Sequence, residues 1–184
     1  MIRALSKKAI LTIATLVLVI TLSGIGVSCG PSEPSQFETY TDETNGFSID
    51  YPQGWYIEHP KERPTIKVSI WSKRLGVNRA CIMVTKESVS VQNLESYSEL
   101  RMQHLSDTTK DYVSISTEEL TINDISAVKH TYTETNGTTS YKTVQVYLVD
   151  DGSGWLFGFA CPQKSFDSYK STFDTALNSF RLLK

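Results

Sequence analysis

Apolar and polar residues alternate in short runs through most of the chain after residue 36. The most regular run is GFSIDYPQGW, residues 46–55, whose period of two is typical of a strand with one buried face. Pro52 cannot donate a hydrogen bond to a neighbouring strand, and Gly54 allows a sharp turn, so the strand should end there. We expect its large apolar side chains to lie in the core: Phe47, Ile49, Tyr51 and Trp55.

Seven further segments have strand patterns of the same kind. They cover residues 37–41, 66–71, 79–85, 112–118, 127–134, 141–149 and 155–161. Turn residues that tolerate positive φ separate several of them, at Asn45-Gly46, Asn136-Gly137 and Asp150–Gly154. The last two turns predict that the final three strands form a pair of hairpins.

The period changes to three or four residues in two segments, which predicts two helices. The first segment, residues 90–105, is only moderately amphipathic, and Ser90 and Asn93 are its alternative N-caps. The second has Ser165 as its expected N-cap and a much stronger apolar stripe, made of Phe166, Tyr169, Phe173, Ala176, Leu177 and Phe180. Such an aromatic stripe usually packs across a sheet, so we expect it in the core.

The order of these elements predicts the fold class. Four strands precede the first helix and four follow it, without the strand-by-helix alternation that parallel sheets require. Residues 155–161 carry apolar side chains on both faces, which indicates a sheet that is covered on both sides. We therefore predict an α+β fold, a three-layer α/β/α sandwich around a central antiparallel sheet, over residues 37–184.

The amino-terminal residues have a different pattern. Three basic residues precede an uncharged, mostly apolar run at 9–26, and small residues then lead to Cys29. This ending resembles the lipobox of bacterial lipoproteins, which implies a signal peptide over 1–28, lipidation of Cys29, and a Pro/Ser-rich tether over 29–36. The alternative is that the apolar run is kept as a membrane anchor. Both alternatives place the domain outside the cytoplasm, attached to a membrane.

Composition and charge limit the partners. The chain has 184 residues, of which 40% are hydrophobic, as in an ordinary globular protein with one domain. All 20 acidic residues follow Cys29, whereas three of the 18 basic residues precede it, so the part after the leader has a net charge of −5. Nucleic acid is therefore excluded as an expected partner, since its phosphates require a basic surface.

The run GFSIDYPQGW, the two late hairpins and a closing helix that ends in NSFRLLK (178–184) resemble the PsbP-like family, named after an extrinsic subunit of photosystem II. The resemblance implies an antiparallel sheet between helices. It says little about activity, because the family includes many bacterial lipoproteins without assigned chemistry. Photosynthetic members help to retain calcium and chloride, but we find no matching ligands in this sequence.

No motif for catalysis or metal binding is present. His59, His104 and His130 are far apart in the sequence and lack the spacing of a metal site. Asp150 and Asp151 precede Gly152 but lack the further ligands of a calcium loop, so a hairpin turn is expected there. Neither a Gly-x-Ser-x-Gly elbow nor a phosphate-binding loop occurs. We expect no enzyme activity, no metal and no cofactor.

Two cysteines and four aromatic residues remain as site candidates. Cys81 and Cys161 could form one disulfide in an exported domain, and the alternative is two buried thiols. Aromatic residues beside the regular apolar positions could form a surface for a partner, although most such residues pack in the core. These candidates for a partner surface are Trp71, Tyr141, Tyr147 and Trp155.

Together these features predict a lipid-anchored, extracytoplasmic, non-catalytic domain that binds an unknown protein or assists a membrane complex. The tether and the PsbP-like resemblance without a reactive site motivate this hypothesis. The alternative is a module that binds a small ligand or a metal ion such as calcium.

Overall fold

A computed structural model describes residue 34, residues 36–89 and residues 93–183. The predicted signal peptide (1–28), the lipidation residue Cys29 and most of the tether (29–36) lie outside these residues. Within them, neither helix has the length and apolar character needed to cross a membrane.

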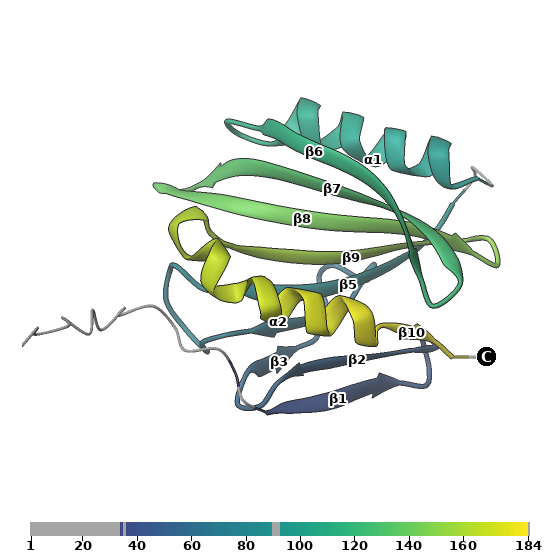
Figure 1. Ribbon diagram of the computed structural model, residues 1–184, viewed down its shortest axis with the longest axis horizontal. Helices are drawn as coiled ribbons and strands as arrows, with labels where there is room; N and C mark the ends of the chain where they lie inside the picture. The colour runs from purple at the N-terminus through teal and green to yellow at the C-terminus, as the bar shows by residue number, and fades with distance from the viewer. Residues whose placement is uncertain (1–33, 35, 90–92, 184) are drawn as a thin grey trace, which may run out of the picture.

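The described residues form ten strands, two α-helices and one short 3₁₀ turn (Figure 1). In the first half these are β1 (Phe37–Asp42), β2 (Phe47–Pro52), β3 (Tyr56–Glu58), β4 (Ile66–Trp71), β5 (Cys81–Ser88) and α1 (Leu94–Thr108). In the second half they are β6 (Val113–Ile122), β7 (Ile125–Asn136), β8 (Thr139–Asp150), β9 (Ser153–Pro162), η1 (Gln163–Ser165), α2 (Phe166–Ser179) and β10 (Arg181–Leu182).

The strands form two antiparallel sheets. The large sheet has seven strands in the order β3-β4-β5-β9-β8-β7-β6, and the small sheet has the order β1-β2-β10. The predicted hairpins are confirmed: β7 pairs with β8 and β8 pairs with β9, and β1 pairs with β2 across Asn45-Gly46. Gly46 and Gly137 both have positive φ, as their turns require.

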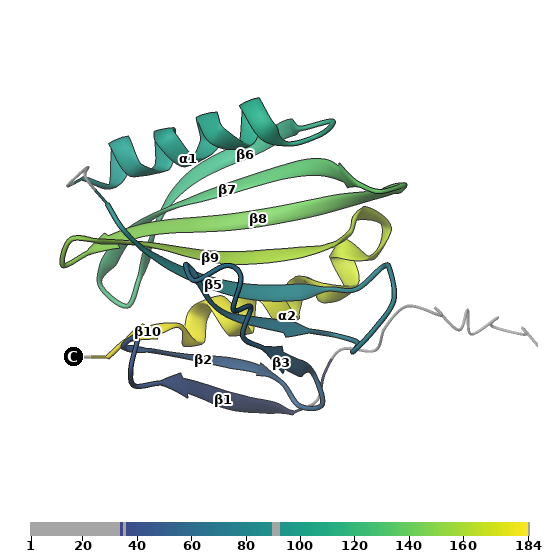
Figure 2. The same cartoon turned by 180° about the vertical axis from the view of Figure 1, so that it is seen from behind.

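The two helices lie on opposite faces of the large sheet (Figures 1 and 2). α1 packs on β7 and β8, whereas α2 packs on β9 and on β2 of the small sheet. The small sheet therefore shares the α2 face, and the molecule has three layers. This confirms the predicted α+β class, with its antiparallel sheet between helices. The small sheet is an addition to the predicted sandwich.

Each face of the large sheet has its own apolar cluster. The main cluster joins the α2 face of β9 to the stripe of α2, where the Phe157 and Phe159 rings lie 5.6 and 5.3 Å from the Phe173 ring. The smaller cluster lies under α1 and centres on Tyr97, Tyr147 and Leu156. Sheet residues supply both clusters because successive side chains of a strand point to opposite faces.

The run GFSIDYPQGW contributes to the main cluster, with one correction. Phe47 and Ile49 are fully buried and Tyr51 is nearly so, as predicted. The expected turn also forms, since the Trp55 amide donates to the Pro52 carbonyl at 3.1 Å and Gly54 has a φ of 83°. Trp55 itself is only half-buried because the turn carries it to the rim of the core, where its ring meets Tyr169 at 5.9 Å.

The strands β6 and β7 are longer than predicted and form another hairpin. They meet at Asn123-Asp124, and both of these residues have positive φ. Glu118 lies within β6, where its carboxylate contacts the Lys129 ammonium at 2.8 Å. The short strands β3 and β10 were not predicted, because three or two residues cannot establish a period.

The helix starts differ in how they are capped. The Asn93 side chain accepts a hydrogen bond from the Ser96 amide at 2.8 Å, so Asn93 is the N-cap of α1. Ser165 precedes α2 but makes no capping hydrogen bond with its side chain, because η1 leads directly into the helix. The apolar stripe of α2 is buried as predicted.

Candidate functional site

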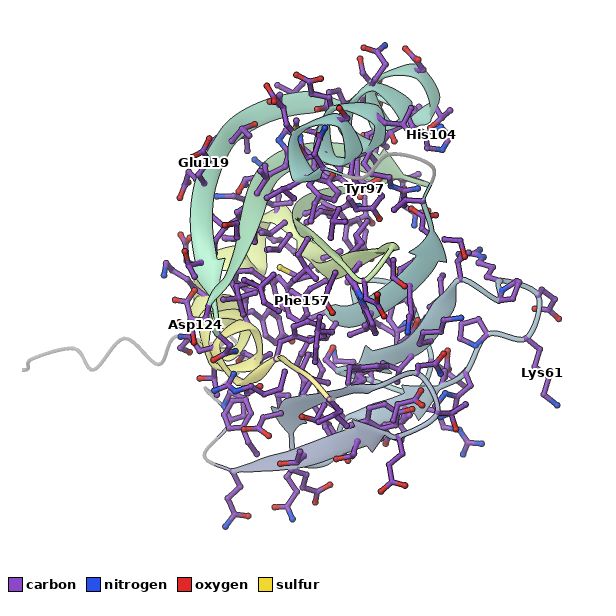
Figure 3. The ribbon with its side chains drawn as sticks, turned by 90° about the vertical axis from the view of Figure 1, so that its right-hand side faces the viewer. Lys61, Tyr97, His104, Glu119, Asp124 and Phe157 are labelled. Atoms are coloured by element: carbon purple, nitrogen blue, oxygen red, sulfur yellow. The ribbon has the colours of Figure 1, made fainter. Side chains whose placement is uncertain are left out.

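A groove of about 380 Å³ lies on the α1 face of the large sheet, beside the area that the helix covers. Figure 3 shows α1, with His104, and the loop that carries Lys61 on the same side of this sheet. The groove runs across β4, β5, β9 and β8. We call it the sheet groove and define it by Trp71, Arg79, Met83, Tyr141, Gln145 and Gly158.

The side-chain pattern of β9 produces the floor of the groove. Its large aromatic residues point to the α2 face, whereas Gly158 and Ala160 point to the groove. A Cβ atom at Gly158 would lie only 3.3 Å from Leu156 and 3.4 Å from Met83, so a glycine here lets these two side chains pack closely over β9. One strand therefore has a bulky face for the core and a small-residue face for the groove.

One wall of the groove carries a polar group without a partner. The guanidinium carbon of Arg79 lies 3.9 Å from the centre of the Trp71 ring, as in a cation–π contact. The buried indole nitrogen of Trp71 has no hydrogen-bond partner among the described residues. Because an unsatisfied buried donor destabilises a protein, a hydrogen-bond acceptor that reached this N–H group would stabilise the folded state.

The rim of the groove has charges of both signs. Glu58, Glu62 and Glu134 lie among its lining residues together with Arg63 and Arg79. The Glu134 carboxylate accepts a hydrogen bond from the Thr143 hydroxyl at 2.8 Å. A mixed rim of this kind does not select for one strongly charged ligand class.

A chain of buried polar side chains connects the groove with the space under α1. The Gln145 amide donates to the Tyr132 hydroxyl at 3.0 Å and accepts from the Tyr147 hydroxyl at 2.8 Å. The Tyr132 ring stacks on His130 at 5.4 Å, and Tyr112 contacts the Nε2 atom of His130 at 2.8 Å. In the sequence, His130 stood out only as one of three separate metal candidates. Alternation on β7 and β8 could have placed His130, Tyr132, Gln145 and Tyr147 on one face.

Three buried titratable side chains in and near the groove, Cys81, Tyr132 and His130, have pKa values shifted toward the neutral form. Burial raises the pKa of the Cys81 thiol to about 12, so it does not form a reactive thiolate. Burial also raises the pKa of Tyr132 and lowers the pKa of His130. These shifts remove charge from buried groups and do not activate a nucleophile.

The two cysteines form no disulfide with each other, which corresponds to the alternative of two buried thiols. Cys81 and Cys161 are both free and buried. Cys81 lies opposite Ala160 in the β5–β9 pairing, so Cys161 is one residue further along β9 and points to the other face of the sheet. Cys81 lines the groove, whereas Cys161 belongs to the main core cluster.

Two of the four aromatic candidates meet at the groove, and two do not. Trp71 and Tyr141 are half-buried and both line it. Tyr147 and Trp155 are only 0% and 3% exposed, so they cannot form a partner surface. Tyr147 is covered by α1, and Trp155 is covered by Phe47 of the small sheet.

The three histidines are not brought together. His59 contacts the Lys67 carbonyl, His104 is exposed on α1, and His130 is buried under α1. No group of three His, Cys, Asp or Glu side chains with metal-site geometry occurs in the described part of the chain. Asp151 and Gly152 have positive φ in the β8–β9 hairpin, as the predicted turn requires.

Buried His130 predicts a pH-dependent stability. Its lowered pKa means that the unfolded chain binds more protons, so its contribution is present above pH ~6.5 and is lost as the pH falls through the lowered value. We expect the free energy of unfolding to fall between pH ~7 and ~5, and His130→Gln to reduce this slope. Denaturant unfolding across this range measures it. The exposed control His104→Gln should keep the wild-type slope, and an unchanged slope in His130→Gln would contradict the assignment.

Comparison with known proteins agrees with the fold. The family profile described as serine/threonine kinase C-terminal domain matches residues 39–182. The structure resembles cyanobacterial PsbP (CyanoP) from Synechocystis sp. PCC 6803, with a TM-score of 0.62, 19% identity, and coverage of 84% of this chain and 97% of that one.

It also resembles LpqN of Mycobacterium tuberculosis, which is described as involved in cell envelope biogenesis, with a TM-score of 0.61, 9% identity, and coverage of 84% and 100% of the two chains. A Pseudomonas aeruginosa protein described as PA94, a putative regulator, matches with a TM-score of 0.57 and 10% identity. The match covers 78% of this chain and 95% of that one. No curated protein sequence matches the chain. The chain has the PsbP-like fold, and its match over residues 39–182 places it in the family of serine/threonine kinase C-terminal domains.

Proposed function

We propose that this protein is a lipid-anchored, extracytoplasmic, non-catalytic domain that binds a segment of a partner protein in the sheet groove. The observation that carries the proposal is the buried indole N–H of Trp71, which has no partner among the described residues and lies on the wall of an open groove. A backbone carbonyl of a bound segment would satisfy it. Half-buried Tyr141 lies in the same groove and would contact the side chains of that segment.

The chemistry of the groove supports binding over catalysis. Its cysteine is a neutral thiol, and the nearby histidine is buried and neutral. A domain named for its position after a kinase is separate from the domain that transfers phosphate, which agrees with a binding role. PsbP and LpqN are similar in fold alone, but the involvement of LpqN in cell envelope biogenesis agrees with a role in the envelope.

The amino-terminal sequence supports the location. The basic start, the apolar run at 9–26 and the small residues before Cys29 fit a lipoprotein leader. The tether that follows is short, so the domain would stay near the lipid surface.

Binding of a small ligand is the second candidate, and the size of the groove favours it. A volume of about 380 Å³ lies within the range of small-molecule sites. Native mass spectrometry of the full-length protein, purified without chelator, separates the two candidates. A stoichiometric mass increment would favour the small ligand over the protein segment.

Site-specific crosslinking in cells tests the groove directly. A photo-reactive amino acid replaces Tyr141 in the groove or, as a control, Lys170 on the exposed side of α2. We expect a discrete protein adduct from position 141 and none from position 170. Adducts from both positions or from neither would contradict the proposed groove.

Trp71→Phe is the sharpest variant for this site. It removes the indole N–H but keeps an aromatic ring for Arg79, so the free energy of unfolding should change by no more than about 0.5 kcal/mol. The crosslinked adduct at position 141 should be strongly reduced, as measured by quantitative blotting. A variant that keeps the full adduct would show that the N–H group is not part of recognition.

A further inference from the structure

We propose that the loop of residues 72–80, between β4 and β5, contacts the anionic surface of the membrane that holds the chain. This inference rests on the proposed amino-terminal anchor and adds a second membrane contact to it. We call this segment the 72–80 loop.

Two apolar side chains project from the loop into solvent. Leu75 and Val77 are 82% and 79% exposed, more than the other exposed large apolar residues of the described chain. Tyr56, which is also exposed, lies opposite Trp71 in the β3–β4 pairing, one residue before the loop begins. Clustered apolar side chains at a loop tip are unfavourable in water and typical of an interaction surface.

Basic residues accompany these apolar side chains. The loop contains Lys73, Arg74 and Arg79 and no acidic residue, although the part of the chain after Cys29 is acidic overall. Lys73 and Arg74 are exposed beside Leu75. Apolar side chains with flanking basic ones match the two layers of an anionic membrane, its acyl boundary and its charged headgroups.

The base of the loop is held in place by the protein itself. The backbones of Ser72 and Ala80 are joined by a hydrogen bond of 2.9 Å, and the Ser72 hydroxyl also accepts from the Ala80 amide. The Arg79 guanidinium donates to the Lys73 and Arg74 carbonyls at 3.3 and 3.0 Å. The apolar tip is therefore presented on a fixed frame, which lowers the entropy lost on binding.

The loop lies at the end of the domain where the chain enters it. The Gln36 carbonyl accepts a hydrogen bond from the Gln53 amide. Three residues after Gln53, Tyr56 pairs with Trp71, the last residue of β4. Figures 1 and 2 show the start of β1 and the β4–β5 connection at the same end. Gln36 is only seven positions after Cys29, a reach of at most about 25 Å, so the anchor would hold this end against the lipid.

A dye attached at position 75 tests the inference. Full-length protein carrying Leu75→Cys or, as a control, Glu119→Cys is labelled with an environment-sensitive dye and reconstituted into phosphatidylcholine vesicles with or without phosphatidylglycerol. Glu119 is exposed on β6, the opposite edge strand of the large sheet (Figure 3). Cys81 and Cys161 are buried and should not react.

We expect blue-shifted emission at position 75, stronger with phosphatidylglycerol, and quenching by spin-labelled lipid, whereas position 119 should report water throughout. Flotation of the same vesicles measures the anchor separately. Protein that floats with the vesicles while position 75 reports water would overturn the loop contact and leave the anchor intact. Protein that does not float would overturn both proposals.

Discussion

Replacing Phe47 with alanine is expected to lower the free energy of unfolding by about 3–5 kcal/mol. Phe47 has no exposed surface, and its ring lies 5.8 Å from the Trp155 ring and 6.1 Å from the Phe180 ring. It joins the small sheet to the large sheet and to the end of α2, so the lost side chain leaves a cavity that no single element can close. Equilibrium denaturation in guanidinium chloride measures the change.

Trp55→Ala is the matched control within the same run of sequence. Trp55 is half-buried at the rim and makes its main ring contact with Tyr169, so we expect a loss of about 1–2 kcal/mol, smaller than for Phe47. Equal losses at the two positions would show that the small sheet is not packed on the main cluster. The smaller loss expected at position 55 reflects the half-buried position of Trp55, which corrects the expectation that Trp55 belongs to the core.

The parts of the fold that were predictable have repeated local signals. The α2 stripe from Phe166 to Phe180 recurs over four turns, and Asn136-Gly137 combines two residues suited to a hairpin. The β6–β7 turn was missed although Asn123 and Asp124 also tolerate positive φ, because neither residue is a glycine.

The groove was less accessible to sequence reasoning because it depends on strand order. Trp71 and Tyr141 are seventy residues apart, and only the order β4-β5-β9-β8 brings them to one face. Likewise, Tyr147 and Trp155 had the same local pattern as Trp71, but α1 and the small sheet bury them. Alternation predicts which residues share a face of one strand, and it does not predict what covers that face.

Strand order also explains why position 154 requires a glycine. Gly154 lies on β9 opposite Glu87 of β5, under the amino-terminal part of α1. A Cβ atom there would lie 2.6 Å from both Tyr97 Cζ and Val89 Cγ1, and 2.7 Å from Tyr97 Cε2. The Tyr97 ring cannot move freely, because its hydroxyl donates to the Glu87 carboxylate at 2.9 Å and its edge packs on Tyr147.

Gly154→Ala is therefore expected to destabilise the protein by about 1–3 kcal/mol, with the loss concentrated in α1. Amide hydrogen exchange should show reduced protection in α1, while β2 and α2 change little. Gly158→Ala is the matched control on the same strand, since its Cβ would meet only the flexible ends of Leu156 and Met83 at 3.3–3.4 Å. Gly154→Ala could instead be as stable as Gly158→Ala, with the α1 amides still protected from exchange. That result would show that the Tyr97 ring does not occupy the position that holds α1 on the sheet.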